Sequence, residues 1–248
     1  MENKTNIVVY DNPDLLAEAA ALRFINSAQA AITLQGRFSI AVAGGNTPKR
    51  VYELLASERY RSRIEWSSVH AFFGDERCVP PDHPDSNYRM VTESLLSQVP
   101  IPAVNVHRMR GEGDPALSAR LYEEELRVFF AAAAWPRFDL ILLGMGDDGH
   151  TASLFPGTAA LREKKAWVVA NWVEQLKTLR LTLTAPAICH AAQIVFLVTG
   201  EAKARRLQEV LSSRRDPERL PAQLIQPVDG SLEWLVDKAA ARESLSSS

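Results

Sequence analysis

The sequence predicts an α/β fold in which helices cover both faces of an open, mainly parallel β-sheet. Four short runs are apolar throughout rather than alternating, which is typical of strands that are buried on both faces. Amphipathic stretches with helical spacing separate these runs, and a polar loop containing glycine directly follows each of them. The four predicted central strands are residues 38–43, 69–73, 138–143 and 194–199.

Two helix starts are predicted from a capping residue followed by proline. Asn12 is expected to cap a helix that begins at Pro13, because its side chain can accept hydrogen bonds from the first helical turn. Thr47 and Pro48 repeat this arrangement for a second helix. Apolar residues follow at helical spacing: Leu16, Ala19, Ala20 and Phe24 in the first helix, and Val51, Leu54 and Leu55 in the second.

Three further helices complete the alternation of strands and helices. One begins near Ser86, one precedes the third central strand, and one follows Glu201. Their marker residues are Val91 and Leu95 in the third, Leu117, Leu121, Glu124 and Val128 in the fourth, and Leu207, Val210 and Leu211 in the fifth. No internal repeat or linker divides the chain, so one domain is expected over residues 1–248, with a frayed end at 243–248.

Composition limits the kinds of partner that the chain can hold. Its 28 Lys and Arg residues against 30 Asp and Glu residues give a formal net charge of −2. This balance argues against a broad positive field for nucleic acid or anionic lipid, so any bound anion must meet a local site. Cys78 and Cys189 form no C-x-x-C pair, which suggests reduced thiols. No apolar run reaches the roughly 18 residues of a membrane span, and a cytoplasmic protein is expected.

The loops after the four strands are expected to converge on one site. They read AGGNTP, GDERCVPPDHPDSN, GMGDDGHTAS and GEAK. In open parallel sheets, the ligand crevice lies outside the carboxyl ends of the strands. The first loop leads into a helix, whose N-terminal N–H groups suit a phosphate, although a capped turn without a ligand explains this loop equally well.

The third loop is open to two interpretations, a dinucleotide-binding motif and a general-base pair. Gly144 to Gly149 reads G-x-G-x-x-G, but Asp147 and Asp148 would repel a dinucleotide pyrophosphate. The same loop places Asp148 two residues before His150. A carboxylate beside an imidazole fixes its tautomer and suits a general base, although a loop histidine is more often a hydrogen-bonded surface residue.

Charged residues near the other loops offer binding groups. Asp75, Glu76 and Arg77 end the second strand, where a solvated charge cluster is the plainer interpretation. The Arg77 guanidinium nevertheless suits a phosphate or carboxylate, and Lys203 can add a point charge from the opposite side.

Other chemistries find no support in the residues. There is no G-x-S-x-G motif for a serine nucleophile, and Cys78, Asp82, His83 and Asp85 match no standard zinc spacing, so no metal is predicted. The remaining histidines, His70, His107 and His190, are interpreted as structural.

Three segments resemble the signature segments of the glucosamine-6-phosphate isomerase and 6-phosphogluconolactonase family, most closely the lactonase members. They are AGGNTP, DERCVPPDHPDSNYRM and GMGDDGHTASLFPG, and the likeness runs in matching order from Val8 to about Val236. The resemblance implies a modified Rossmann-like fold. It also implies hydrolysis of 6-phospho-D-glucono-1,5-lactone in the oxidative branch of the pentose phosphate pathway, without a metal or another cofactor. A small phosphosugar lactone is then the partner, with no nucleic acid, membrane or obligate protein partner.

The resemblance also implies roles for single residues. His150 would be the general base and Asp148 its orienting partner. One departure is Asn46, where many members carry serine, which puts a side-chain hydroxyl contact in doubt. The residues expected to bind the substrate are Gly45, Asn46, Thr47, Asp75, Arg77, Arg180 and Lys203, with Arg180 or the glycine-loop amides as candidate oxyanion donors.

Two alternatives remain on the same scaffold. The deaminases and isomerases of the family place an acidic residue five positions after the loop histidine, whereas this chain has Phe155, which cannot move a proton. A sugar-phosphate sensor would normally carry an added DNA-binding segment, and the chain begins its first βα unit by Val8. Hydrolysis is therefore preferred.

Overall fold

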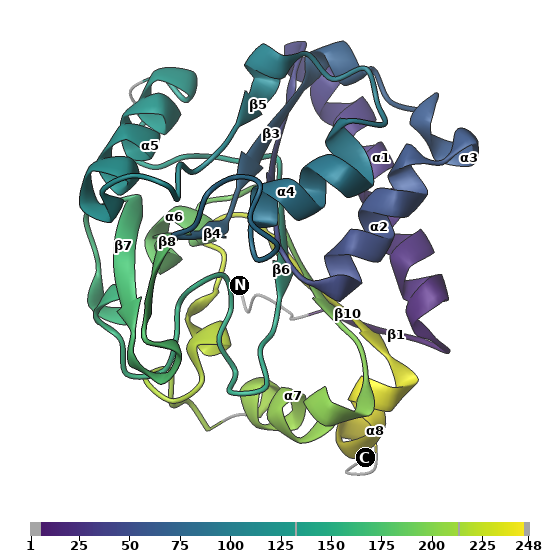
Figure 1. Cartoon of the computed structure of the whole chain (residues 1–248). Coiled ribbons are helices and arrows are strands. Elements are labelled where there is room, and N and C mark those ends of the chain that lie inside the picture. The colour runs from purple at the N-terminus through teal and green to yellow at the C-terminus, as the bar shows by residue number, and fades with distance from the viewer. Residues whose placement is uncertain (1–5, 132, 213, 246–248) are drawn as a thin grey trace.

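A computed structural model of the chain describes residues 6–131, 133–212 and 214–245, which form two β-sheets surrounded by helices (Figure 1). The larger sheet has seven strands in the order β1-β10-β9-β6-β2-β3-β5, and every pairing in it is parallel. The smaller sheet has the order β4-β8-β7 and is antiparallel. The expected α/β architecture with a mainly parallel sheet is confirmed.

Four of the strands follow the predicted apolar runs closely. The large sheet comprises β1 Asn6–Tyr10, β2 Phe38–Val42, β3 Val69–Phe73, β5 Val106–His107, β6 Leu140–Gly144, β9 Gln193–Val198 and β10 Ser231–Asp237. The small sheet comprises β4 Asp75–Arg77, β7 Val168–Val173 and β8 Thr178–Leu183. The four predicted central strands are β2, β3, β6 and β9, and their side chains are almost all buried, as strands covered on both faces should be.

Eight α-helices are described. They are α1 Pro13–Gln35, α2 Asn46–Ala56, α3 Glu58–Arg61, α4 Asn87–Val91, α5 Pro115–Phe129, α6 Ala185–Cys189, α7 Ala204–Leu211 and α8 Lys238–Leu245. Figure 1 shows α1 and α2 on one side of the large sheet and α5 with the small sheet on the other. None of the helices in the described residues is long and apolar enough to cross a membrane.

The two predicted helix starts have different outcomes. The Asn12 side chain accepts hydrogen bonds from the backbone N–H groups of Asp14 and Leu15, so the predicted cap of α1 is confirmed. Thr47 is not a cap. Helix α2 begins at Asn46, two residues before the predicted start at Pro48, and Gly45 occupies the cap position. The Thr47 hydroxyl instead lies 2.7 Å from that of Thr199 in the loop after β9.

Helix α5 is confirmed, but its marker residues lie on the wrong face. Leu117, Leu121 and Val128 are 42%, 46% and 82% exposed, whereas Tyr122 and Leu126 are buried. The Tyr122 hydroxyl accepts a hydrogen bond from the Phe73 N–H, which ties α5 to the end of β3. Tertiary packing on polar and aromatic atoms, rather than the leucine spacing, sets the orientation of this helix.

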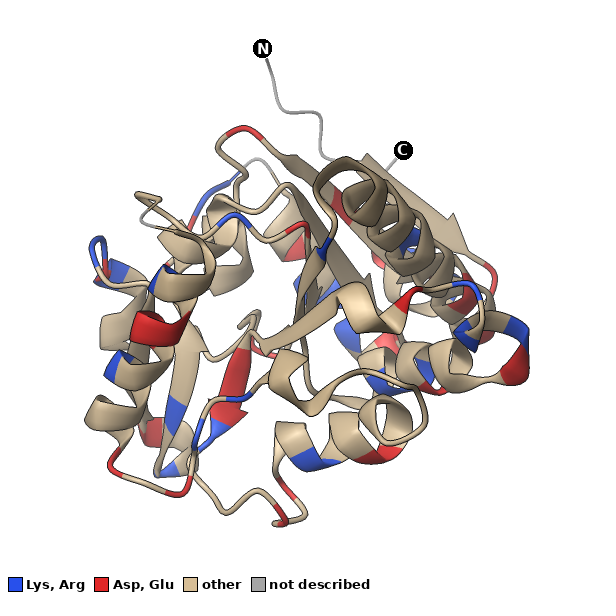
Figure 2. Cartoon of the chain, turned by 90° about the horizontal axis from the view of Figure 1, so that it is seen from above, with Lys and Arg blue, Asp and Glu red and all other residues tan. Residues whose placement is uncertain are grey.

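The ends of the chain and the surface charges agree with an ordinary folded domain. Of the end that was expected to be frayed, residues 243–245 continue α8, and residues 246–248 lie outside the described part. Figure 2 shows Lys and Arg interspersed with Asp and Glu over the visible elements. No broad single-sign region appears in this view, in keeping with the net charge of −2.

Candidate active site

A cavity of about 450 Å³ lies where the loops after β2, β6 and β9 meet the start of the small sheet. The predicted convergence of the four loops is confirmed, because each contributes to this wall. The residues that were predicted from the sequence and that line this cavity are Gly45, Asn46, Thr47, Asp75, Arg77, His150 and Lys203. The volume lies within the range of pockets that hold small molecules.

One end of the cavity is formed by the N-terminus of α2. Gly45 has a φ of 98°, a left-handed conformation that glycine adopts at little cost. Gly44 is needed for a different reason, since a Cβ there would lie 1.9 Å from Oδ1 of Asn87. The first N–H groups of α2 have no acceptor within the helix and carry the positive end of its dipole. This arrangement suits a phosphate.

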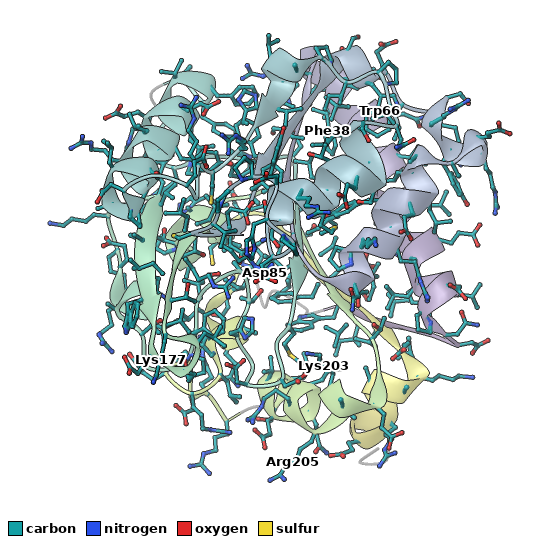
Figure 3. The ribbon with its side chains drawn as sticks, viewed as in Figure 1. Phe38, Trp66, Asp85, Lys177, Lys203 and Arg205 are labelled. Carbon is teal, nitrogen blue, oxygen red and sulfur yellow. The ribbon has the colours of Figure 1, made fainter. Side chains whose placement is uncertain are left out.

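Two cations flank that end. The Arg77 guanidinium donates a hydrogen bond to the carbonyl of Asp85, and Lys203 Nζ lies 2.5 Å from Oδ1 of Asp147. In Figure 3, Asp85 is labelled below α4 and Lys203 above α7, on different segments of the chain. Asp147 belongs to the loop after β6, and Lys203 belongs to the segment after β9. An ion pair therefore joins the third and fourth of the predicted loops.

Asp148 and His150 form a close pair in the loop after β6. Oδ1 of Asp148 lies 2.6 Å from Nδ1 of His150 and also accepts a hydrogen bond from the His150 N–H. Partial burial opposes ionisation of the carboxyl group, but the hydrogen bonds and charge of His150 outweigh it and hold the pKa of Asp148 below its ordinary value. Asp148 therefore stays ionised at neutral pH and can orient the imidazole.

The imidazole of His150 is also enclosed by two other residues of its loop. The Phe155 ring is stacked on it, with 3.9 Å between the ring centroids and 23° between the ring planes. A Cβ at Gly146 would lie 2.1 Å from both Nδ1 and Cε1 of the imidazole. Gly146 thus provides the space that the ring occupies, a requirement that the G-x-G-x-x-G spacing does not reveal.

Asp75 connects three segments that are far apart in sequence. Its Oδ2 accepts a 2.6 Å hydrogen bond from the Ser153 hydroxyl, and its Oδ1 lies 3.3 Å from Nδ2 of Asn87. Asn87 itself lines the cavity. Asn87 and Ser153 fall within the second and third of the loops that were expected to converge, but the sequence does not single them out, because their contacts with Asp75 depend on how these loops fold.

Glu76 is buried, which contradicts the interpretation of residues 75–77 as a solvated charge cluster. Its carboxylate accepts hydrogen bonds from the backbone N–H groups of Arg77, Asn87 and Tyr88 and from the Ser86 hydroxyl. Burial raises its pKa, although the backbone N–H groups oppose this shift. Glu76 fixes the segment that carries Asn87 relative to Arg77. The alternation of half-buried and buried side chains in β4 accompanies this role.

Arg180 lies opposite Arg77 in the register of β4 and β8, and it is not among the residues that line the cavity. Its Nε is buried and has no hydrogen-bond partner among the described residues. Burial, followed by the charge of Arg77, lowers the pKa of Arg180. The structure therefore places this arginine beside Arg77, outside the residues that line the cavity.

His70, His107 and His190 take part in packing and hydrogen bonding away from the cavity lining. His70 stacks on His107, which pairs with Glu125, and Nδ1 of His190 lies 2.7 Å from the Pro186 carbonyl. His107 and His190 thus have partners that the sequence did not suggest. Within the described residues, no group of three or more His, Cys, Asp or Glu side chains is arranged to hold a metal ion.

Comparisons with known proteins place this fold and site in context. The family described as glucosamine-6-phosphate isomerases/6-phosphogluconolactonase matches residues 11–234. The chain is 45% identical over 232 residues to a 6-phosphogluconolactonase of Synechocystis sp., covering 92% of this chain and 94% of the relative. It is 41% identical over 243 residues to a 6-phosphogluconolactonase of Nostoc sp., covering 97% and 98%.

Solved structures agree with the sequence relatives. The 6-phosphogluconolactonase from Trypanosoma cruzi superposes with a TM-score of 0.86 at 30% identity, covering 98% of this chain and 97% of that one. A monomeric glucosamine-6-phosphate deaminase reaches a TM-score of 0.82 at 19% identity, covering 96% and 99% of the two chains. At that identity, the second likeness concerns the fold alone.

Proposed function

The chain belongs to the family of glucosamine-6-phosphate isomerases and 6-phosphogluconolactonases, and from that premise we propose that it hydrolyses 6-phospho-D-glucono-1,5-lactone to 6-phospho-D-gluconate. The observation that carries this proposal is the Asp148–His150 pair on the wall of a cavity whose other end is the N-terminus of α2 flanked by Arg77. The site thus offers a base and an anion-binding end within one substrate-sized space.

We assign the phosphate to the anion-binding end. The backbone N–H groups at Asn46 and Thr47, the Arg77 guanidinium and the Lys203 ammonium group would bind its oxygens. Lys203 would exchange its contact with Asp147 for the phosphate. Arg180 would add positive potential from beside Arg77, and because it does not line the cavity it is not assigned to the oxyanion. Asp75 would accept hydrogen bonds from sugar hydroxyls.

His150 is assigned the role of general base. With Nδ1 bound to Asp148, Nε2 is left to accept a proton from water as the water oxygen attacks the lactone carbonyl carbon. The tetrahedral intermediate then collapses, the bond from the carbonyl carbon to the ring oxygen breaks, and that oxygen takes the proton from the imidazolium. The ionised Asp148 stabilises the imidazolium that forms between the two proton transfers.

Phe155 separates this assignment from the deaminase and isomerase alternative. Its apolar ring stands where the resemblance places an acidic proton-transfer group in those relatives, and in the structure it packs flat against His150. No described atom of Phe155 can take up or donate a proton. The sensor alternative explains neither the aligned pair nor the close lactonase relatives.

Replacement of His150 by alanine tests this mechanism. The change is expected to lower kcat by roughly 10²–10⁴-fold, the usual contribution of a general base, with little change in the affinity for inorganic phosphate. Hydrolysis of freshly prepared lactone, corrected for its spontaneous rate, measures the first effect. Near-normal turnover in this variant would reject His150 as the base.

Two further expectations accompany the proposal. The chain acts in the cytoplasm on a small phosphorylated lactone. It does so without a metal, nucleic acid, membrane surface or obligate protein partner. The near-neutral charge and the two thiols support these expectations.

A further inference from the structure

We propose that Phe155 is a positioning residue that fixes the plane of the His150 imidazole, and that the small sheet holds Phe155 in place through Ser153 and Asn171. This inference rests on the proposed function, because it concerns how the general base is aimed. It gives the small sheet a structural role that no motif in the sequence predicts.

The hydrogen bond to Asp148 leaves the imidazole incompletely restrained. A contact at Nδ1 selects the edge of the ring that faces the carboxylate, yet the ring can still tilt about the hydrogen bond. Phe155 removes this freedom, because its buried ring lies nearly parallel to the imidazole at a centroid distance of 3.9 Å. Gly146 limits the ring near Nδ1 and Cε1. Among the described residues, Nε2 makes no hydrogen bond and is the atom left for a water molecule.

Phe155 is itself held by a hydrogen-bonded turn. Its carbonyl accepts hydrogen bonds from the Thr158 N–H at 3.2 Å and from the Thr158 hydroxyl at 2.8 Å. Nδ2 of Asn171, on strand β7, donates to that same hydroxyl and to the carbonyl of Ser153. The turn that presents the aromatic ring is therefore fastened to β7 at two points.

Ser153 connects the same loop to the other two strands of the small sheet. Its N–H donates to the hydroxyl of Thr182 on β8 at 3.2 Å, and its own hydroxyl donates to Asp75 on β4 at 2.6 Å. Ser153, Asn171 and Thr182 are all buried, so water does not compete for these bonds. One residue of the histidine loop thus contacts all three strands through its N–H, carbonyl and hydroxyl groups.

A ring that only fills space would affect stability, whereas a ring that aims the base affects kcat. Misplacement of a catalytic group by about 1 Å costs on the order of 10²-fold in rate. The phosphate-binding end is built from other segments, so KM should be insensitive to the stacking. A change confined to kcat therefore distinguishes aiming from general packing.

The experiment compares Phe155→Leu, Phe155→Tyr and Phe24→Leu with the wild-type enzyme on fresh lactone. Phe155→Leu is expected to lower kcat by roughly tenfold or more with KM unchanged within about twofold. Phe155→Tyr keeps an aromatic face and is expected to retain most of the turnover. Phe24→Leu removes an equally buried ring that packs on Phe38, away from the site, and should leave kcat and KM unchanged.

Proton NMR of the imidazole gives a readout that does not depend on activity. A ring stacked at this distance shields the His150 ring protons, so their signals should move downfield in Phe155→Leu and stay near their wild-type positions in Phe155→Tyr. The signals are assigned by their loss in His150→Ala. Unchanged kcat or unchanged signals in Phe155→Leu would overturn the proposal, as would an equal loss of kcat in Phe24→Leu. An inactive wild-type enzyme would instead reject the proposed function, and the NMR comparison would still report on the stacking.

Discussion

Replacing Asp148 by asparagine is expected to reduce turnover while leaving substrate binding intact. Asp148 accepts two hydrogen bonds from His150, one from the ring and one from the backbone, and an amide oxygen can preserve the backbone contact. The substitution removes the negative charge that stabilises the imidazolium during the reaction. If the amide N–H₂ turns toward the ring instead, it favours the tautomer in which Nε2 carries the proton and cannot act as the base.

The size of the effect follows from the distance and the exposure of the pair. Opposite charges about 4 Å apart near a protein surface attract by about 4 kcal/mol. The Asp148 side chain is 40% exposed, so screening by water reduces this attraction. A hydrogen bond to a charged group contributes about 1.5–3 kcal/mol. At 1.36 kcal/mol per tenfold, the expected loss in kcat is about 10- to 160-fold. KM should change little, because Arg77 and the N-terminus of α2 are untouched.

Steady-state hydrolysis of fresh lactone at neutral pH measures this loss after subtraction of the spontaneous reaction. Asp147→Asn is the matched control, because it removes the same charge from the same loop but contacts Lys203 rather than His150. This control is expected to change KM and to preserve kcat. A kcat for Asp148→Asn within about threefold of wild type would refute the assigned role of the pair.

Two further substitutions and one labelling experiment test other parts of the molecule. Arg77→Ala is expected to raise KM by roughly tenfold or more, the value of a charge-assisted hydrogen bond, and an unchanged KM in lactone kinetics would remove Arg77 from the phosphate site. Gly146→Ala is expected to displace the imidazole and lower kcat while phosphate affinity, measured by calorimetry, is retained; full activity would show that the ring does not need this space. Burial raises the pKa of Cys78 to about 11, so alkylation by iodoacetamide should be slow at pH 8 and accelerate as the pH approaches 11. Rapid modification at pH 8 would contradict a half-buried, protonated thiol.

The four central strands of the large sheet were predictable because burial on both faces leaves a strong local signal. The runs that became β2, β3, β6 and β9 are apolar throughout, and each ends at a polar loop. The small sheet gave no such signal. Strand β4 is only Asp75–Arg77, three charged residues, and its place is set by pairing with β8 more than a hundred residues later. Pairing at that separation has no local signature.

The same division applies to the site. Asp148 and His150 are close in sequence, so their pairing was a local inference. Glu76 and Asn87 are brought together by the folding of the loop after β3, and Ser153 reaches Asp75 from the loop after β6; spacing encodes neither contact. Arg180 was expected among the substrate-binding residues from the resemblance to the family. Its position opposite Arg77 depends on the register of the small sheet.

The central claim, that the chain hydrolyses a phosphorylated lactone and does not release ammonia from an amino sugar, is tested most directly by one paired assay. The same preparation is supplied with fresh 6-phosphogluconolactone and, separately, with glucosamine 6-phosphate. The site predicts lactone hydrolysis well above the spontaneous rate, lost in His150→Ala, and no ammonia above a heat-treated control. Ammonia release from glucosamine 6-phosphate, or lactone hydrolysis no faster than in buffer, would contradict it.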